Sequence, residues 1–243
     1  LFSVVLLHYN QPQYLRRALL SVLEQNYPQI ELLVADDASP EFDRAAVCAF
    51  IDAHKRQNLK NWQIVASDEN VGTVANLNRV LPQTSGACVL CFAADDALYD
   101  ETVLSRFAQG LAESGPDTLC VSAQCVMMDA ELSAETGVFT DAALAQKLNG
   151  ETARAQFHAL QLEPRYALGA SAFLREALLA RTPAFDPAYR LIEDWPFFLA
   201  RTRAGQSVRF LPFPALRHRA GGVSDTARQS ESIHRQFKAD MLH

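Results

Sequence analysis

Three pairs of adjacent carboxylates are the residues of this chain best suited to chemistry. They are Asp36-Asp37, Asp95-Asp96 and Glu193-Asp194. Each of the first two pairs ends an apolar run, and carboxylates in such a place are costly unless a cation or a hydrogen-bonding ligand meets them. Two pairs at strand ends, with a third elsewhere, predict a site for a metal-bound, phosphorylated ligand.

Alternating strand and helix patterns would position the first two pairs. Continuous apolar runs, typical of parallel strands covered on both faces, recur between segments with helical spacing. The expected strands are 4–7, 30–35, 63–66 and 87–92, and the expected helices begin near Pro12 and span 45–54 and 74–81. This repeat implies right-handed crossovers and an open, mostly parallel sheet, in which ligands bind beyond the carboxyl ends of the strands. His8, Tyr9 and Asn10 leave the first strand at the same edge.

The second half of the chain is less regular. A helix over 101–112 and a strand over 119–123 continue the pattern. Beyond them, the sequence predicts short helices and weak strands in 129–164, helices at 174–180 and 194–204, a short strand at 208–211 and a polar helix in 225–243.

Composition excludes some classes of partner. With 22 Lys and Arg against 28 Asp and Glu, the net charge is −6, and no basic stripe indicates nucleic acid as a partner. We interpret most arginines of the basic stretch 201–219 as solvated surface. The five cysteines are odd in number and mostly in apolar surroundings, which predicts free thiols in a reducing cytosol.

No run is long and apolar enough to be expected to span a bilayer, and we expect no signal peptide. The chain begins almost directly on a strand, which is typical of one domain of a longer protein. Contact with a membrane through another segment therefore stays open.

Five segments recur in the order and spacing of a known family. They are 3–10, which ends in Tyr-Asn, 27–39 with the first Asp pair, 70–86, 185–195 with Glu193-Asp194, and 217–224 with Arg217-His218. Together they resemble an inverting glycosyltransferase of family 2, and the likeness spans nearly the whole chain. It implies an α/β, Rossmann-like GT-A fold: a mostly parallel central sheet flanked by helices, with a smaller acceptor-side subregion.

The resemblance also implies a division of labour along the chain. Residues 1–125 would form the half that binds the nucleotide-sugar donor. Residues 126–224 would form the acceptor-binding and catalytic-base half of the same domain, and 225–243 a C-terminal helical tail.

A divalent cation is expected between Asp96 and the donor. The charge of a leaving diphosphate must be neutralised, and Mn²⁺ or Mg²⁺ held by oxygen ligands can do this. We expect Asp96 to be a metal ligand, and Asp95 to assist it or, as the resemblance implies, to contact the ribose of the donor. His218 could ligate the metal or contact diphosphate, and Arg217 could pair with phosphate oxygens. One aspartate could instead cap the helix near 101.

The first Asp pair is expected to bind the nucleotide. Asp36 resembles the residue that accepts a hydrogen bond from the base, which for uracil comes from its ring N–H. Asp36 could also close an Asx-type turn, and both roles can hold at once. Asn10 and Asn78 are further expected contacts with the donor. Asp37 would assist Asp36 or orient the loop, and Tyr9 could stack on the base or belong to the core.

The third pair is expected to supply the general base. Asp194 would take the proton of the acceptor hydroxyl on the face opposite the leaving group, and direct displacement inverts the anomeric centre. Glu193 is the weaker alternative. The pair could instead only place negative charge at a helix N-terminus, but Phe185-Asp186 upstream and Trp195 downstream favour the catalytic interpretation.

Two positions depart from the family pattern. Ala93 stands where many members have an additional Asp, and Leu77 where Arg is usual, so that one donor contact is either missing or supplied by Arg79. These departures support the alternative of a non-catalytic sugar- or nucleotide-binding, degenerate transferase. No Gly-rich phosphate loop follows the first strand, which argues against a pyrophosphorylase or a dinucleotide dehydrogenase.

We therefore predict a metal-assisted, inverting transfer of a sugar from a nucleotide diphosphate sugar, with UDP the favoured nucleotide. The expected acceptor is a glycan or a lipid-linked glycan. The predicted location is the cytoplasm, including peripheral contact with the inner face of the membrane.

Overall fold

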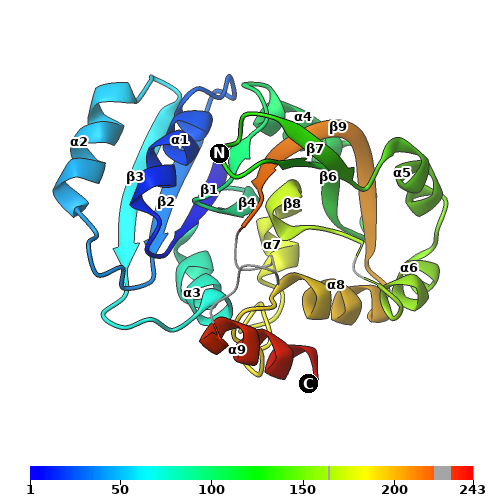
Figure 1. Ribbon diagram of the computed structural model, residues 1–243. Coiled ribbons are helices and arrows are strands. Elements are labelled where there is room, and N and C mark those ends of the chain that lie inside the picture. The colour runs from blue at the N-terminus through cyan, green and yellow to red at the C-terminus, as the bar shows by residue number, and fades with distance from the viewer. Residues whose placement is uncertain (164, 222–230, 243) are drawn as a thin grey trace.

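The computed structural model describes residues 1–163, 165–221 and 231–242. Its centre is a nine-stranded sheet in the order β3-β2-β1-β4-β8-β6-β9-β5, with β7 paired to β6. Helices flank this curled sheet (Figure 1). The predicted α/β class is confirmed.

The first half forms the parallel part of the sheet. Its strands are β1 (Phe2–His8), β2 (Ile30–Asp36), β3 (Leu59–Ala66) and β4 (Cys88–Ala93), joined by α1 (Pro12–Leu23), α2 (Arg44–His54), α3 (Thr73–Val80) and the short η1 (Leu81–Gln83). The register pairs His8 with Asp36 and Leu7 with Ala93. The strands therefore end level with one another, and the residues that follow them share one edge.

The second half makes the sheet mixed. Its elements are β5 (Ala97–Leu98), α4 (Val103–Ala112), β6 (Thr118–Met128), β7 (Glu135–Phe139), α5 (Ala142–Asn149), α6 (Ala153–Leu160), η2 (Leu168–Ala170), β8 (Ser171–Leu174), α7 (Arg175–Leu178), α8 (Asp194–Arg203), β9 (Ser207–Arg219) and α9 (Glu231–Met241). Strand β8 pairs antiparallel with both β4 and β6. Strand β9 runs parallel to β6 and antiparallel to β5.

Strand β9 differs from the sequence prediction. We expected a short strand at 208–211 and a loop at 217–224, but β9 continues to Arg219 and pairs it with Met128 of β6. Two prolines within 207–219 weaken the strand pattern in the sequence, and the partners β5 and β6 restore it. The extension matters because it carries His218 and Arg219 to the carboxyl end of β4.

Other differences are smaller. Strand β8 was not expected, and the helix predicted at 174–180 is the single turn α7. The predicted C-terminal helix is present as α9, while 225–230 lies outside the described residues.

Apolar cores cover both faces of the sheet. One packs α1, α2 and α4 against alternate strand residues such as Val4 and Leu6, and the other packs α3, α7 and α8 against their neighbours such as Val5. Pro12 opens α1 as expected, because its fixed φ suits the first turn. In the described ranges, no helix has the length and apolar character needed to cross a bilayer.

Candidate functional site

Asp95 and Asp96 lie at the turn between β4 and β5, buried against the end of β9. The Asp96 carboxylate is 3.0 Å from His218 Nδ1 through Oδ2, and its Oδ1 accepts the backbone N–H of Arg219 at 3.0 Å. Asp95 Oδ2 accepts from Arg219 Nη2 at 3.0 Å and from Gln11 Nε2 at 3.1 Å. The structure thus brings both predicted carboxylates together with His218.

The charged groups of this cluster shift one another's pKa values. Burial raises the pKa of Asp96, and the neighbouring Asp95 adds to this, while His218 opposes it. Burial alone would lower the pKa of His218, but Asp96 and Asp95 outweigh it and the pKa is raised. An imidazolium is therefore favoured beside the two carboxylates.

Arg219 is a site residue that the sequence prediction missed. Its side chain is buried, pairs with Asp95 and lies over the ring of Tyr14 at 4.2 Å. The interpretation of 201–219 as mostly solvated surface is wrong for Arg219 and for Arg201, both of which are buried. The sequence offered one signal for Arg219, which is that it directly follows His218. This signal becomes informative only when β9 is known to extend to residue 219.

The donor set at Asp96 suits a divalent cation. Across the described residues, no three His, Cys, Asp or Glu side chains are gathered into a ready metal site. Mg²⁺ in nucleotide sites, however, is usually bound through one or two carboxylates together with substrate phosphates. Asp96 supplies hard oxygen donors at the strand ends, and His218 supplies a nitrogen donor beside them. These residues fit a metal that would be completed by the ligand.

Asp36 lies in a polar network at the end of β2. Its Oδ1 is 2.7 Å from His8 Nδ1 and accepts from Ser39 Oγ at 2.6 Å, and its Oδ2 accepts the Ser39 N–H at 3.0 Å. The expected Asx-type turn is therefore present. Burial would raise the pKa of Asp36, but these hydrogen bonds outweigh it and lower the pKa. Ala38, with a φ of 61°, turns the chain back so that Ser39 can reach the carboxylate.

The exit of β1 lies beside this network. His8 is buried and also escaped the sequence prediction as a site residue; its Nε2 has no hydrogen-bond partner among the described residues. Asn10 has a φ of 51° and donates its N–H to Ser39 Oγ. Tyr9 is 46% exposed, which rules out the core alternative for this ring. A stacking role for Tyr9 stays a prediction.

Asp37 orients a neighbouring loop. Its two carboxylate oxygens accept the N–H groups of Val71 and Gly72, each at 2.9 Å. This matches the expected loop-orienting role, and it also uses both oxygens of Asp37 within the protein.

Asn78 is tied to another loop. Its amide nitrogen donates to Phe185 O at 2.8 Å and its Oδ1 accepts Phe185 N at 2.9 Å. Asn78 therefore holds the loop at Phe185, and a contact of this residue with the donor stays a prediction.

Leu77, which departs from the family pattern, and the nearby Arg79 both contact other parts of the protein. Leu77 is fully buried in the apolar core. Arg79 donates to the carbonyls of Val65 and Ala66, and so holds the end of β3. Leu77 has no polar side-chain atom to offer a donor, and a donor contact by Arg79 stays a prediction.

Glu193 and Asp194 stand at the start of α8 and keep partial contact with solvent. Removal from water, together with repulsion from Asp194, raises the pKa of Glu193 to about 8. Burial also raises the pKa of Asp194, while the charge of His218 opposes it. The charge of Glu193 in turn helps to raise the pKa of the buried Cys91 thiol on β4, after burial itself. The pair therefore lies within electrostatic reach of both β4 and His218.

Arg217 is near the cluster but turned to another partner. Its guanidinium lies 4.8 Å from the centre of the Tyr99 ring. A contact with phosphate stays a prediction for this residue.

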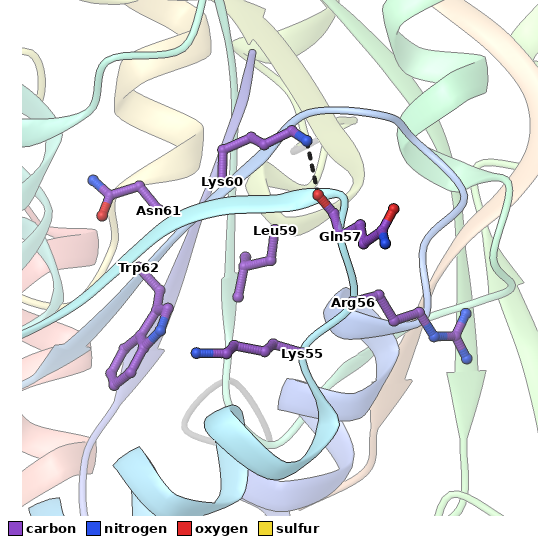
Figure 2. A pocket seen from close by; sticks show the side chains of 7 residues that line it. All are labelled: Lys55, Arg56, Gln57, Leu59, Lys60, Asn61 and Trp62. Carbon is purple, nitrogen blue, oxygen red and sulfur yellow. Dashed lines mark hydrogen bonds between the residues drawn. The ribbon is translucent and has the colours of Figure 1, made fainter.

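A separate hollow lies at the opposite edge of the sheet (Figure 2). Its lining residues are Lys55, Arg56, Gln57, Leu59, Lys60, Asn61 and Trp62. It surrounds the beginning of β3, whereas Asp36 pairs with the end of that strand. Lys55 is bonded to Asp52 and Lys60 to the Gln57 carbonyl, so two of its cations are already engaged. The carboxylate cluster, and not this hollow, is the candidate site.

Solved structures with the same arrangement define the class of fold. S. aureus TarS 1–349 in complex with UDP superposes over 100% of this chain and 65% of its own, with a TM-score of 0.67 and 16% identity. The mannosyltransferase PcManGT from Pyrobaculum calidifontis, in complex with GDP-Man and Mn²⁺, matches 93% of this chain and 59% of its own, with a TM-score of 0.69 and 21% identity. The fold is that of the GT-A glycosyltransferases.

The sequence itself identifies the family. Residues 3–179 match the family described as glycosyl transferase family 2, and this chain belongs to that family. Curated relatives include the glycosyltransferase AglE of Haloferax volcanii, 29% identical over 47% of this chain and 36% of that protein. Another is protein CgeD of Bacillus subtilis, 30% identical over 44% of this chain and 25% of that protein. The chain thus spans well under half the length of these relatives.

Proposed function

We propose that this chain transfers a sugar from a nucleotide diphosphate sugar to a glycan or lipid-linked glycan, with inversion at the anomeric carbon. The observation that carries the proposal is the convergence of Asp36, Asp96 and Asp194 on one end of the sheet. Asp36 and Asp96 follow strands that end level with one another, and Asp194 lies in the field of His218, which contacts Asp96.

The donor would lie along the ends of β1, β2 and β4. Asp36 is ionised and acceptor-only, which suits a base that offers a ring N–H, as uracil does. Asp96 and His218 would hold Mn²⁺ or Mg²⁺, which when bound neutralises the diphosphate. Asp95, Arg217 and Arg219 are further candidates for contacts with ribose and phosphate.

Two solved neighbours support these choices. TarS has been crystallised with UDP and with UDP-GlcNAc, which supports a UDP-sugar as the donor. PcManGT carries GDP-Man and Mn²⁺, which supports the metal and keeps a GDP-sugar as the second donor to test.

Asp194 would remove the proton of the acceptor hydroxyl. A general base must be near the reacting hydroxyl and must be deprotonated at the working pH. Positive charge at this place, carried by the His218 imidazolium or by the cation that a neutral His218 would hold, favours the ionised form of Asp194, whereas Glu193, with its pKa of about 8, is mostly protonated at neutral pH. The two adjacent carboxyls thereby differ in state, and Asp194 is the better base.

The first test is a thermal-shift panel of UDP, GDP, dTDP and CMP, each with Mn²⁺ and with chelator. We expect UDP with Mn²⁺ to stabilise the protein, by about 2.7 kcal/mol at a hundredfold its dissociation constant. UDP-sugars would then be screened for turnover with glycan acceptors and lipid-linked acceptors presented in vesicles. If every nucleotide leaves the melting temperature unchanged, the donor site is degenerate and the proposal fails. Stabilisation without turnover of any sugar would favour the non-catalytic binding module suggested by Ala93 and Leu77.

A further inference from the structure

One buried carboxylate of the C-terminal helix collects three consecutive backbone N–H groups. Asp240 Oδ2 accepts from Arg190 at 3.1 Å, from Leu191 at 2.7 Å and from Ile192 at 3.1 Å. Its other oxygen accepts from Gln236 Nε2 at 2.8 Å, and the residue is 4% exposed. Burial would raise the pKa of Asp240, but these four hydrogen bonds outweigh it and lower the pKa, so the acceptor is ionised. A single charged acceptor thus fixes the path of three residues far away in the sequence.

Those three residues immediately precede Glu193-Asp194. Helix α8 begins at Asp194, and the side chain of its N-cap residue, Glu193, makes no capping hydrogen bond. Without a cap from Glu193, the first turn is supported locally by Asp194 itself, whose Oδ1 accepts the Trp195 N–H at 2.7 Å. The position of Asp194 therefore depends on the backbone leading into α8, which is the segment that Asp240 holds.

The same segment is fastened to the donor half on its other side. Arg190 Nη2 donates to Asn70 at both its carbonyl (2.9 Å) and its Oδ1 (2.8 Å), and Arg190 O accepts the Val74 N–H at 3.2 Å. Gly72 permits this approach: an added Cβ would lie 2.7 Å from Arg190 Cγ, and its φ is +87°. Since Asp37 holds Gly72, the segment lies between α9 and the loop that joins β3 to α3.

We infer that Asp240 is a positioning residue for the transfer reaction, holding the backbone that presents Asp194 to the acceptor hydroxyl. This inference rests on the proposed function. Helix α9, beside the loop before α8 in Figure 1, lies outside residues 3–179, which match the family. Asp194 and the segment that Asp240 holds also lie outside that matched region, so α9 supports a part of the chain that the family match does not cover.

The test compares D240A, D240N and the control K238A, which changes an exposed residue of the same helix. For D240A we expect kcat to fall about tenfold to a hundredfold, because displacing a catalytic group by about 1 Å costs rate on this scale. The KM for the donor and the thermal shift caused by UDP with Mn²⁺ should not change. D240N should keep kcat within about threefold of the wild type, since its amide oxygen can accept the same N–H groups. K238A should match the wild type.

Hydrogen exchange supplies a readout that needs no turnover. The amides of residues 190–192 should be protected in the wild type, D240N and K238A, and should exchange faster in D240A. Unchanged protection of these amides or unchanged kcat in D240A overturns the inference. A loss of UDP binding in parallel with the loss of kcat also overturns it, because that result indicates a general structural role for Asp240. If D194N keeps full turnover, the base assignment fails instead. If D194N is inactive while D240A is fully active, the positioning role alone fails.

Discussion

The carboxylate pairs Asp95-Asp96 and Glu193-Asp194 have nearly the same composition but opposite surroundings. Arg219, Gln11 and the His218 ring meet the first pair at hydrogen-bonding distance. The second pair keeps partial contact with solvent, and its pKa values are raised by burial and, for Glu193, by its neighbour. The first pair is thus held by hydrogen-bonding partners, whereas in the second pair the charge of Asp194 helps to keep a proton on Glu193.

This difference separates binding from proton transfer. A pair whose oxygens are held by hydrogen-bonding partners is preorganised for a cation and phosphate, because its donor atoms are already in place. A pair in which the pKa of Glu193 is raised to about 8 and that of Asp194 is also raised is suited to accept a proton from a hydroxyl. The first pair thus suits the donor and the second the acceptor, and the following experiments test that assignment.

The largest effect is expected for Asp194→Asn. Removal of the base should lower kcat by about a hundredfold to ten-thousandfold, because general base catalysis contributes on this scale. The UDP-dependent thermal shift should remain, since Asp36 and Asp96 are untouched. E193Q is the matched control and should lose much less activity. Full turnover by D194N, with an intact melting curve, would remove Asp194 from the mechanism.

The second-largest effect is expected in the free energy of unfolding, at the pair Asp95-Asp96. Arg219→Ala leaves Asp95 buried without its cation, and breaking a buried pair in this way costs about 3 kcal/mol or more. Arg217→Ala, two residues earlier on β9, loses only its position over the Tyr99 ring and should cost less than about 1 kcal/mol. Urea unfolding of both variants measures the contrast. Equal losses would show that burial of Arg219 is not what stabilises the cluster.

A third effect should appear in the pH dependence of stability. The pKa of Glu193 is raised from 4.5 to about 8 in the folded chain, so the folded state binds more protons than the unfolded state between these values. Stability from this group is therefore present at low pH and is lost as pH rises from about 4.5 towards 8.

Glu193→Gln should remove that loss. Relative to the wild type, we expect the variant to gain about 1–2 kcal/mol between pH 5 and pH 8, less than the full shift implies because the side chain keeps some solvent contact. Thermal unfolding across this range is the measurement. E24Q, which changes an exposed carboxylate, should follow the wild-type curve. If E193Q follows it too, Glu193 is ionised in the folded chain at neutral pH.

The smallest effect concerns the network at Asp36. Ser39→Ala removes a hydroxyl that donates to Asp36 and accepts from Asn10, and should cost about 1 kcal/mol. Ser133→Ala removes a similar bond to Asp129 in an exposed turn, where water can replace it, and should cost less. Chemical denaturation compares the two. A larger loss for S133A would show that the Asp36 network is not tightly held.

Much of the parallel half could be predicted from local pattern. Continuous apolar runs bounded by polar exits are produced by strands buried on both faces, so β1, β2 and β4 and the Asp pairs that follow them were placed correctly. The Asx-type turn at Asp36 depends on short-range chemistry and was also anticipated, and a loop-orienting role was expected for Asp37, although the loop that it holds lies 34 and 35 positions further along the chain.

Partners distant along the chain could not be predicted in this way. Arg219 meets Asp95 across 124 positions only because β9 pairs with β6 up to its last residue and with β5 at Leu216 and Arg217. The register of β1 with β2 makes His8 a partner of Asp36. The side chain of Asn78 hydrogen-bonds to Phe185, which the sequence pattern did not indicate.

The sequence by itself determined which side chains leave the strands at the carboxyl edge, because apolar periodicity and turn chemistry are local properties. Only the tertiary structure decided which of these carboxylates meet hydrogen-bonding partners and how burial shifts their pKa values. That outcome depends on burial, on the cations and the N–H group that β9 brings, and on the Asp240 carboxylate of α9, and none of these can be read from spacing along the chain.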